Sequence, residues 1–324
     1  MNRFAAAVAF FYLFSSVVLA LENNECSAAQ NRVGKCEQSL VVEEETWLDD
    51  SRNYVGTSAD DLAIWIDSFF SEPRTDIESA DSLLRLTYES QWREGDGISE
   101  NVKLRGKIHL PGINKRLSLV FADEEGDDLE ERTDLDTLSS GSENTQLTLQ
   151  YKAREGTRVR IDYGLGISSS LKGKAKVRYR YQLPWSETTT HRLTETLYFV
   201  DGDGFGLRSH YELDYAVTDS RLLRWSNNAK FAEDIDGVEW STRLSLAGRL
   251  NKKRGASLFT WINGETRPKY LTKSYGLGLL FRRDFYRSWL FLEMEPAYAW
   301  RKKSTDLSRN GEWLFAVRVE MLID

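Results

Sequence analysis

Hydrophobic residues recur at every second position over most of the chain, from about residue 83 to the C-terminus. The clearest run alternates Ala175, Val177 and Tyr179 with Lys174, Lys176 and other cations. Successive side chains of a β-strand point to opposite faces, so this period of two predicts strands with one apolar and one polar face. The runs lie near residues 84–92, 102–110, 117–121, 147–151, 159–167, 175–183, 193–200, 205–217, 223–231, 238–250, 256–262, 275–281, 290–300 and 313–321.

The length and ends of these runs favour a membrane barrel. Several are near the roughly 9 to 11 residues that a tilted strand needs to cross a bilayer. We therefore predict an all-β fold, a transmembrane antiparallel β-barrel of about 12 to 14 strands over residues 81–324. A water-soluble β-sandwich also alternates, but its outer face carries mostly Ser and Thr, whereas Arg, Lys and Glu fill the polar positions here. Aromatic residues recur near the segment ends, as an interfacial belt requires: Trp92, Tyr151, Trp225, Trp240, Trp300 and Trp313.

The connections between runs alternate in length, as they do in membrane barrels. With the first strand running outward, short periplasmic turns are predicted at residues 111–114, 154–157, 184–187, 218–220, 251–255 and 284–287. The longer outer connections are predicted at residues 122–144, 265–269 and 301–310.

The first twenty residues are typical of a secretory signal. Arg3 precedes an apolar stretch from Ala5 to Ala20, and polar residues follow. The stretch is shorter than the roughly 20 residues of a membrane-spanning helix, which is the alternative. We predict a cleaved signal peptide over residues 1–20 and a location in the outer membrane of a Gram-negative bacterium.

Residues 21–80 differ from the rest and are predicted to form a periplasmic N-terminal segment. Nine residues separate Cys26 from Cys36, and the two are expected to form a disulfide in an oxidising compartment. An amphipathic helix is predicted at about residues 60–70, packing as a cap or plug at the barrel mouth rather than on a membrane surface, because its polar face is acidic. The apolar face of this helix comprises Leu62, Trp65, Ile66 and Phe69, with Ile64 and Phe70 beside them.

Candidate catalytic chemistry is sparse. His210 is the best general base, and it shares the polar strand face with Glu212 and Asp214, but Ser209 points to the opposite face. We predict no catalytic residue, no cofactor and no metal site. The net charge is −7 and the basic residues are dispersed, so nucleic acid is not an expected partner.

A track of cations on the predicted lumenal face is the most informative feature. Arg and Lys lining a pore lower the barrier for anions and raise it for cations. The alternative is an interior closed by salt bridges to acids such as Glu89, Glu293 and Glu295. The track comprises Lys103, Arg105, Lys107, Arg158, Arg160, Lys174, Lys176, Arg178 and Arg180.

Three short sequences carry a resemblance: Trp65-Ile66-Asp67-Ser68-Phe69-Phe70, Leu84-Arg85-Leu86 and Trp92-Arg93-Glu94-Gly95. With them, most of the mature chain resembles a family of uncharacterised exported outer-membrane barrels of proteobacteria. That resemblance implies the barrel fold and no particular activity. A looser likeness, to acidic-oligosaccharide porins with arginine-lined lumens, depends on the basic track alone.

Three functions remain open from the sequence. The first is a passive channel for small anionic solutes, and the second is a closed structural barrel whose periplasmic segment binds an envelope partner. The third is an outer-membrane hydrolase with His210 as its base. The expected partners are outer-membrane lipid and lipopolysaccharide, the barrel-assembly machinery during biogenesis, and a periplasmic protein in the second case.

Overall fold

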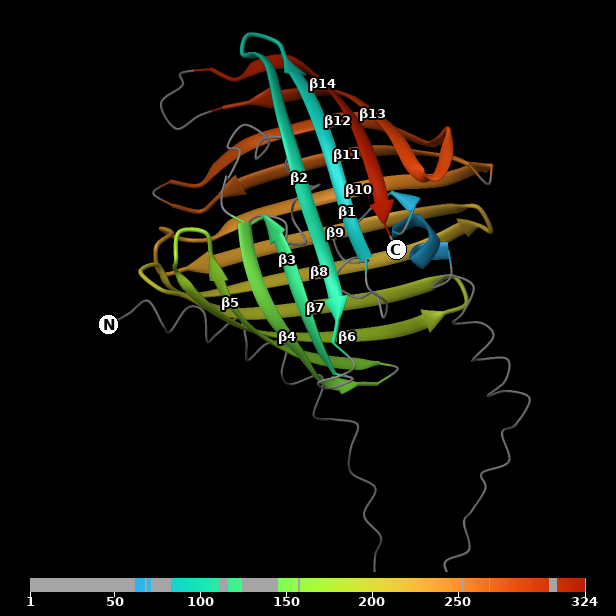
Figure 1. Ribbon diagram of the computed structural model, residues 1–324. Coiled ribbons are helices and arrows are strands. Elements are labelled where there is room, and N and C mark those ends of the chain that lie inside the picture. The colour runs from blue at the N-terminus through green and yellow to red at the C-terminus, as the bar shows by residue number, and fades with distance from the viewer. Residues whose placement is uncertain are drawn as a thin grey trace, which may run out of the picture. The chain divides into compact units, whose positions relative to one another are not determined.

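The fold is a closed antiparallel β-barrel, seen in the computed structural model (Figure 1). The structure describes residues 62–67, 69–70, 83–110, 116–123, 145–156, 158–251, 253–267, 269–302 and 308–323. Within them fourteen strands pair in sequence order, which confirms the predicted fold class at the upper end of its strand count. The strands are β1 (Leu83–Arg93), β2 (Gly97–His109), β3 (Leu117–Asp123), β4 (Thr145–Glu155), β5 (Val159–Ser168), β6 (Gly173–Ser186), β7 (Thr189–Val200), β8 (Gly204–Thr218), β9 (Arg221–Ala232), β10 (Glu239–Asn251), β11 (Arg254–Glu265), β12 (Leu271–Phe285), β13 (Arg287–Arg301) and β14 (Asn310–Ile323).

The first and last strands close the barrel. Their register runs from Leu84 opposite Ile323 to Arg93 opposite Leu314 without a shift. Closure pairs the first strand with the last, as hydrocarbon requires of a spanning sheet, although β2 pairs with β3 over four residues only, from Gly106 to His109.

The two ends of the barrel differ in their connections. One end, called here the turn end, joins β6 to β7, β8 to β9, β10 to β11 and β12 to β13 through one or two residues. The other, called the loop end, includes the long connections from Asp123 to Thr145 and from Arg301 to Asn310. The predicted alternation of connection length is therefore confirmed for these strands.

Burial in the barrel is the inverse of burial in a soluble protein. Outward-facing Leu165 is 66% exposed and Trp313 is 54% exposed, whereas lumen-facing Arg282, Lys107 and Glu293 are each 1% exposed. An apolar exterior around a polar interior is the arrangement that a lipid bilayer requires of a spanning barrel. Closure and inverted burial together exclude the β-sandwich.

A short helix over residues 62–67, followed by Phe69 and Phe70, packs inside the turn end and is called here the plug segment. Figure 1 shows it in blue beside the end of β14. Leu62, Ile66 and Phe69 are buried, but Ile64 is 59% exposed and lies outside the packed face, contrary to the broad apolar face predicted. The cause is geometric, because Ile64 lies on the side of the helix that faces away from the barrel wall.

The alternation predicts a polar lumen throughout, but part of the lumen is apolar. Some lumenal positions of β9–β14 carry apolar side chains, and these form one cluster with the plug segment. Gly255 illustrates the fit, since a Cβ there would lie 2.7 Å from the Phe69 ring. The barrel's share of this cluster is Leu222, Ala247, Phe259, Trp261, Leu280, Phe291, Ala297, Ala299 and Leu314.

Several predictions fall outside the described residues. They are the signal peptide and the cysteine pair Cys26 and Cys36. Among the described residues, no helix is long and apolar enough to cross a membrane.

Candidate functional site

Cations dominate the lumenal side of β2–β8, a surface called here the basic wall. The same strands carry three lumen-facing carboxylates among the described residues, Asp162, Glu212 and Asp214. Several of the cations have interactions inside the protein, so the wall is an excess of positive charge rather than a row of bare groups. The basic wall comprises Lys103, Arg105, Lys107, Lys152, Arg160, Lys174, Lys176, Arg178, Arg180, Arg192 and Arg208.

The strand register explains why like charges gather. Arg160 on β5 lies directly opposite Arg180 on β6, and Lys174 and Lys176 lie opposite Gly166 and Gly164. These neighbours supply no carboxylate. Asp162 is the exception on β5, where it accepts hydrogen bonds from Arg160 Nε at 2.9 and 3.1 Å.

The structure brings together most of the cations predicted from the sequence. Lys107, Arg160, Arg178 and Arg180 are buried on the lumenal side, and their strand neighbours of the same parity face the same way. Arg158 is different, because it lies in the turn before β5 and is exposed.

The sequence analysis missed four cations: Lys152 on β4, Arg192 on β7, Arg208 on β8 and Lys230 on β9. Each stands as a single cation among neutral lumen-facing neighbours, so no run of alternating charge marks it. The parity of the flanking apolar residues was the available signal, since it places each of the four on the lumenal face.

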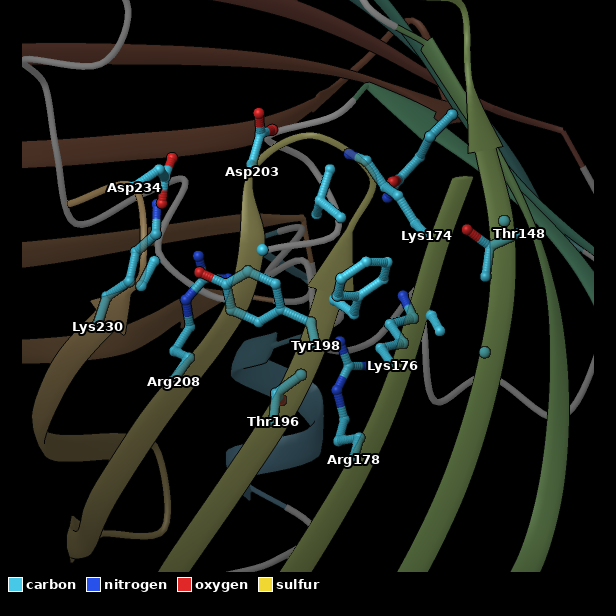
Figure 2. Close-up of a pocket in the computed structure, with 18 residues that line it drawn as sticks. Thr148, Lys174, Lys176, Arg178, Thr196, Tyr198, Asp203, Arg208, Lys230 and Asp234 are labelled. Carbon is cyan, nitrogen blue, oxygen red and sulfur yellow. The ribbon is translucent and has the colours of Figure 1, made fainter. Parts of the chain in front are cut away.

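A cavity of about 200 Å³ opens in the basic wall near the loop end. Figure 2 shows Lys176, Arg178, Tyr198 and Arg208 projecting from neighbouring strands toward this space. The other lining residues include Lys174, Lys230, Gln146, Thr148, Thr196, Asp203 and Asp234.

Glycines shape the cavity. A Cβ at Gly164 would lie 2.7 Å from the Lys176 side chain, and one at Gly206 would lie 2.2 Å from the Tyr198 ring. Without side chains at these two positions, Lys176 and Tyr198 can lie flat along the wall.

The two carboxylates that line the cavity belong to the loop end. Asp203 follows β7 and forms an ion pair with Lys172, whose Nζ lies 2.7 Å from the carboxylate. This ion pair offsets the negative charge of Asp203. Asp234 follows β9, and in Figure 2 it lies beside Lys230. The deeper part of the cavity is therefore framed by Lys176, Arg178 and Arg208.

Opposite the basic wall, β12–β14 and β1 carry a lumenal network called here the ion-pair wall. Arg318 lies 2.9 Å from Glu89, 2.7 Å from Glu293 and 2.5 Å from Glu295. Arg282 lies 2.6 Å from Glu320 and 3.2 Å from Glu293. Arg85, 3.7 Å from Glu320, completes the network.

A second ion-pair group fastens the plug segment. Asp67 is 1% exposed and accepts a hydrogen bond from Arg224 of β9. The same guanidinium donates to both oxygens of Asp214, at 2.6 and 2.9 Å. Arg249 lies over the Trp65 ring, 4.9 Å from its centroid. The plug segment is thus held by one buried ion pair as well as by apolar packing.

His210 shares the lumenal face with Glu212 and Asp214, as predicted. Its Nδ1 contacts the amide oxygen of Asn228, and its Nε2 lies 3.5 Å from Glu212. Ser209 faces outward, where it donates a hydrogen bond to Glu195. Neither ring nitrogen contacts the Ser209 hydroxyl, so His210 and Ser209 do not form a pair of base and nucleophile.

Among the described residues, no group of three or more His, Cys, Asp and Glu side chains is arranged to hold a metal ion.

The chain matches no protein-family model and no curated protein. Among solved structures it is similar to a NanC porin, at 8% identity and a TM-score of 0.36, over 73% of this chain and 98% of that one. It is also similar to OmpT, an outer-membrane protein of Vibrio cholerae, at 11% identity and a TM-score of 0.43, over 75% of this chain and 97% of that one. A third similar structure is OccAB3 of Acinetobacter baumannii, at 7% identity and a TM-score of 0.42, over 75% of this chain and 98% of that one. The barrel of this protein is established by its own strand pairing.

Proposed function

We propose that this protein is an outer-membrane barrel that serves as a passive channel for small anionic solutes, with the basic wall as its selectivity element. The excess of cations over carboxylates on β2–β8, gathered around a lumenal cavity, carries this proposal. The turn end, which holds the plug segment, would face the periplasm, and the basic cavity would open toward the outside.

The apolar exterior supports the membrane location. Large hydrophobic residues such as Leu104, Leu165 and Leu277 are more than a third exposed around the barrel. In water such a continuous apolar surface would drive aggregation, whereas in hydrocarbon it is matched by the lipid tails.

The size and lining of the cavity indicate the solute class. A volume of about 200 Å³ is below the range of roughly 300–1,000 Å³ typical of drug-sized ligands, so a small solute fits best. Guanidinium and ammonium groups donate charge-assisted hydrogen bonds to carboxylates and phosphates. Arg178, Arg208 and Lys176 would supply these donors, and the Tyr198 hydroxyl lies among them.

The plug segment bears on the alternative of a structural barrel that binds a partner. Leu62, Ile66 and Phe69 pack inside the barrel, so this face of the helix is not available to such a partner. A partner would have to use the outward side near Ile64 instead. This arrangement favours the plugged channel.

Conductance and ion selectivity of the refolded full-length protein in a planar bilayer test the proposal. We expect a pore with anion preference that falls when Lys176, Arg178 and Arg208 are all replaced by Gln. Arg158→Gln is the matched control, since it removes a cation that lies outside the cavity and should leave selectivity unchanged. A wild-type protein without conductance, or with cation preference, would overturn the proposal.

A further inference from the structure

Among the described strands, the ladder between β2 and β3 is the shortest. It comprises four residue pairs and ends at Gly106 opposite Phe121. Arg105 and Ala122, the next residues on the two strands, do not pair, although β2 begins as far away as Gly97. Figure 1 shows β2 extending well beyond the end of β3. The wall is therefore divided from this point toward the loop end, a feature called here the split.

The split begins inside the apolar belt. Phe121 faces outward at its base, and its ring lies across Gly106, where a Cβ would be 2.3 Å from the ring. Above the base, Leu104 and Val102 face outward from β2 and are 45% and 63% exposed. Trp92, near the loop end of β1, is an interfacial residue by its place in the barrel. The base of the split thus lies deeper in the membrane than this interface.

The backbone along the split requires polar partners. An N–H or C=O group without a hydrogen bond is costly in hydrocarbon, and an open edge at this depth is tolerated where water or polar groups reach it. In the described part of the chain, no strand pairs with the β3-facing edge of β2 between Gly97 and Arg105. A polar group therefore suits the split better than an acyl chain alone.

The lumenal side of the split is basic. Lys103 and Arg105 face the lumen there and are half-buried, whereas Lys107, below the split, is 1% exposed. The register places Arg85 opposite Arg105 and Thr87 opposite Lys103, so no carboxylate lies directly across from either cation. Both cations have interactions within the protein. An anionic group that enters through the split would join this excess of positive charge.

The lumenal cavity lies on the same side of the barrel as the split. Its lining begins with Gln146 and Thr148 on β4, the strand next to β3. Lys176 extends from β6 toward β4, since a Cβ at Gly164 of β5 would lie 2.7 Å from Lys176 Cε and 3.2 Å from Thr148 Cγ2. The cations of the cavity and those of the split therefore belong to one continuous part of the basic wall.

We propose that the split is a lateral binding site for a single-chain amphiphile with a phosphate or carboxylate head. The head lies on the lumenal side at Lys103 and Arg105, which bind such groups through charge-assisted hydrogen bonds. The acyl chain stays in the membrane along Val102 and Leu104. Glu100, which is exposed and faces outward on β2, would repel an anionic head left outside the wall. This site goes beyond the proposed channel, because its ligand arrives through the wall.

Photocrosslinking in neutral lipid vesicles tests the proposal with the full-length protein. The probes are lysophosphatidic acid and a free fatty acid, each with a diazirine near the end of its acyl chain. Crosslinks mapped by mass spectrometry should concentrate on the outward residues Val102, Leu104 and Phe121, and concentration of either probe supports the proposal. Lysophosphatidylcholine with the same chain is the control and should show no concentration there. Crosslinks of both anionic probes spread evenly around the belt, or confined to lumenal residues, would overturn the proposal.

A pair of variants tests the role of the two cations. Lys103→Gln combined with Arg105→Gln should lower crosslinking at the split about tenfold, because two charge-assisted hydrogen-bond donors are lost. Arg158→Gln, which removes an exposed cation in a turn, should crosslink as the wild type does. The gel mobility of unboiled samples shows that each variant is folded, and undiminished capture by the folded double variant would overturn the proposal.

The two proposals of this article fail separately. Ion conductance and selectivity depend on a path along the barrel axis past Lys176, Arg178 and Arg208. A selective pore without capture at the split would overturn the lateral site alone, and capture without conductance would overturn the channel alone.

Discussion

The basic wall and the ion-pair wall both contain lumenal arginines, and they differ in what the strand register places beside each one. In the ion-pair wall Arg318 is surrounded by Glu89, Glu293 and Glu295 from two neighbouring strands. In the basic wall Arg180 lies opposite Arg160. In the ion-pair wall the charges of cations and carboxylates compensate one another. In the basic wall the cations outnumber the carboxylates, which leaves a net positive field in the lumen.

Under the proposed function, this difference separates charge that stabilises the barrel from charge that attracts a solute. A buried ion pair that loses one partner leaves an uncompensated charge, so the residues of the ion-pair wall depend on one another. Clustered like charges repel one another, and a cleft lined by one sign of charge raises the local concentration of the opposite ion. Substitutions in the two walls should therefore affect different properties of the protein.

The largest effect is expected from Arg318→Met. It removes the cation shared by three carboxylates and should lower the free energy of unfolding by about 3–5 kcal/mol. Denaturant titration of the refolded barrel in detergent, followed by tryptophan fluorescence, measures this loss. Arg180→Met in the basic wall is the control and should cost far less, because it also relieves repulsion from Arg160. Equal losses in the two walls would contradict the comparison.

A smaller effect is expected from Asp67→Asn in the plug segment. The amide keeps the shape of the side chain but removes the charge that Arg224 holds, which should weaken docking by about 1–3 kcal/mol. The expected result is a larger mean single-channel conductance, since the segment leaves the turn end more often. Ile64→Ala on the exposed side of the same helix should leave conductance as it is. Unchanged conductance in Asp67→Asn would show that the segment does not obstruct the lumen.

The smallest effect is expected from Gly206→Val. Its side chain would displace the Tyr198 ring into the cavity, since even a Cβ there would lie 2.2 Å from the ring. Block of the single-channel current by inorganic phosphate should become a few-fold weaker, which corresponds to roughly 1 kcal/mol. Gly173→Val, where a Cβ has no neighbour within 4 Å, is the matched control. Weaker block in both variants would mean that the cavity is not the phosphate site.

The barrel could be predicted because its signal is local. Side chains in a strand alternate between two faces whatever lies beside the strand, so runs such as Ala175 to Leu183 identify strand, outward face and lumenal face at once. The lumenal position of Lys107 and Arg178 followed from the same parity.

The site was harder to predict because it depends on neighbours. Lys152 and Arg208 each follow a neutral lumen-facing residue on their own strand, and only their place beside β5, β6 and β7 makes them part of one wall. Gly164 and Gly206 gave no signal of a cavity, since their importance lies in the side chains of other strands that occupy the space above them.

The sequence by itself therefore determined the class of fold, the strand boundaries to within a few residues and the face on which each strand residue lies, since these follow from a period of two along one strand. The tertiary structure decided which cations meet carboxylates, which meet other cations, and where the plug segment packs. The physical reason is that charge pairing, packing and hydrogen bonding act between strands, and the register between strands is a property of the closed barrel.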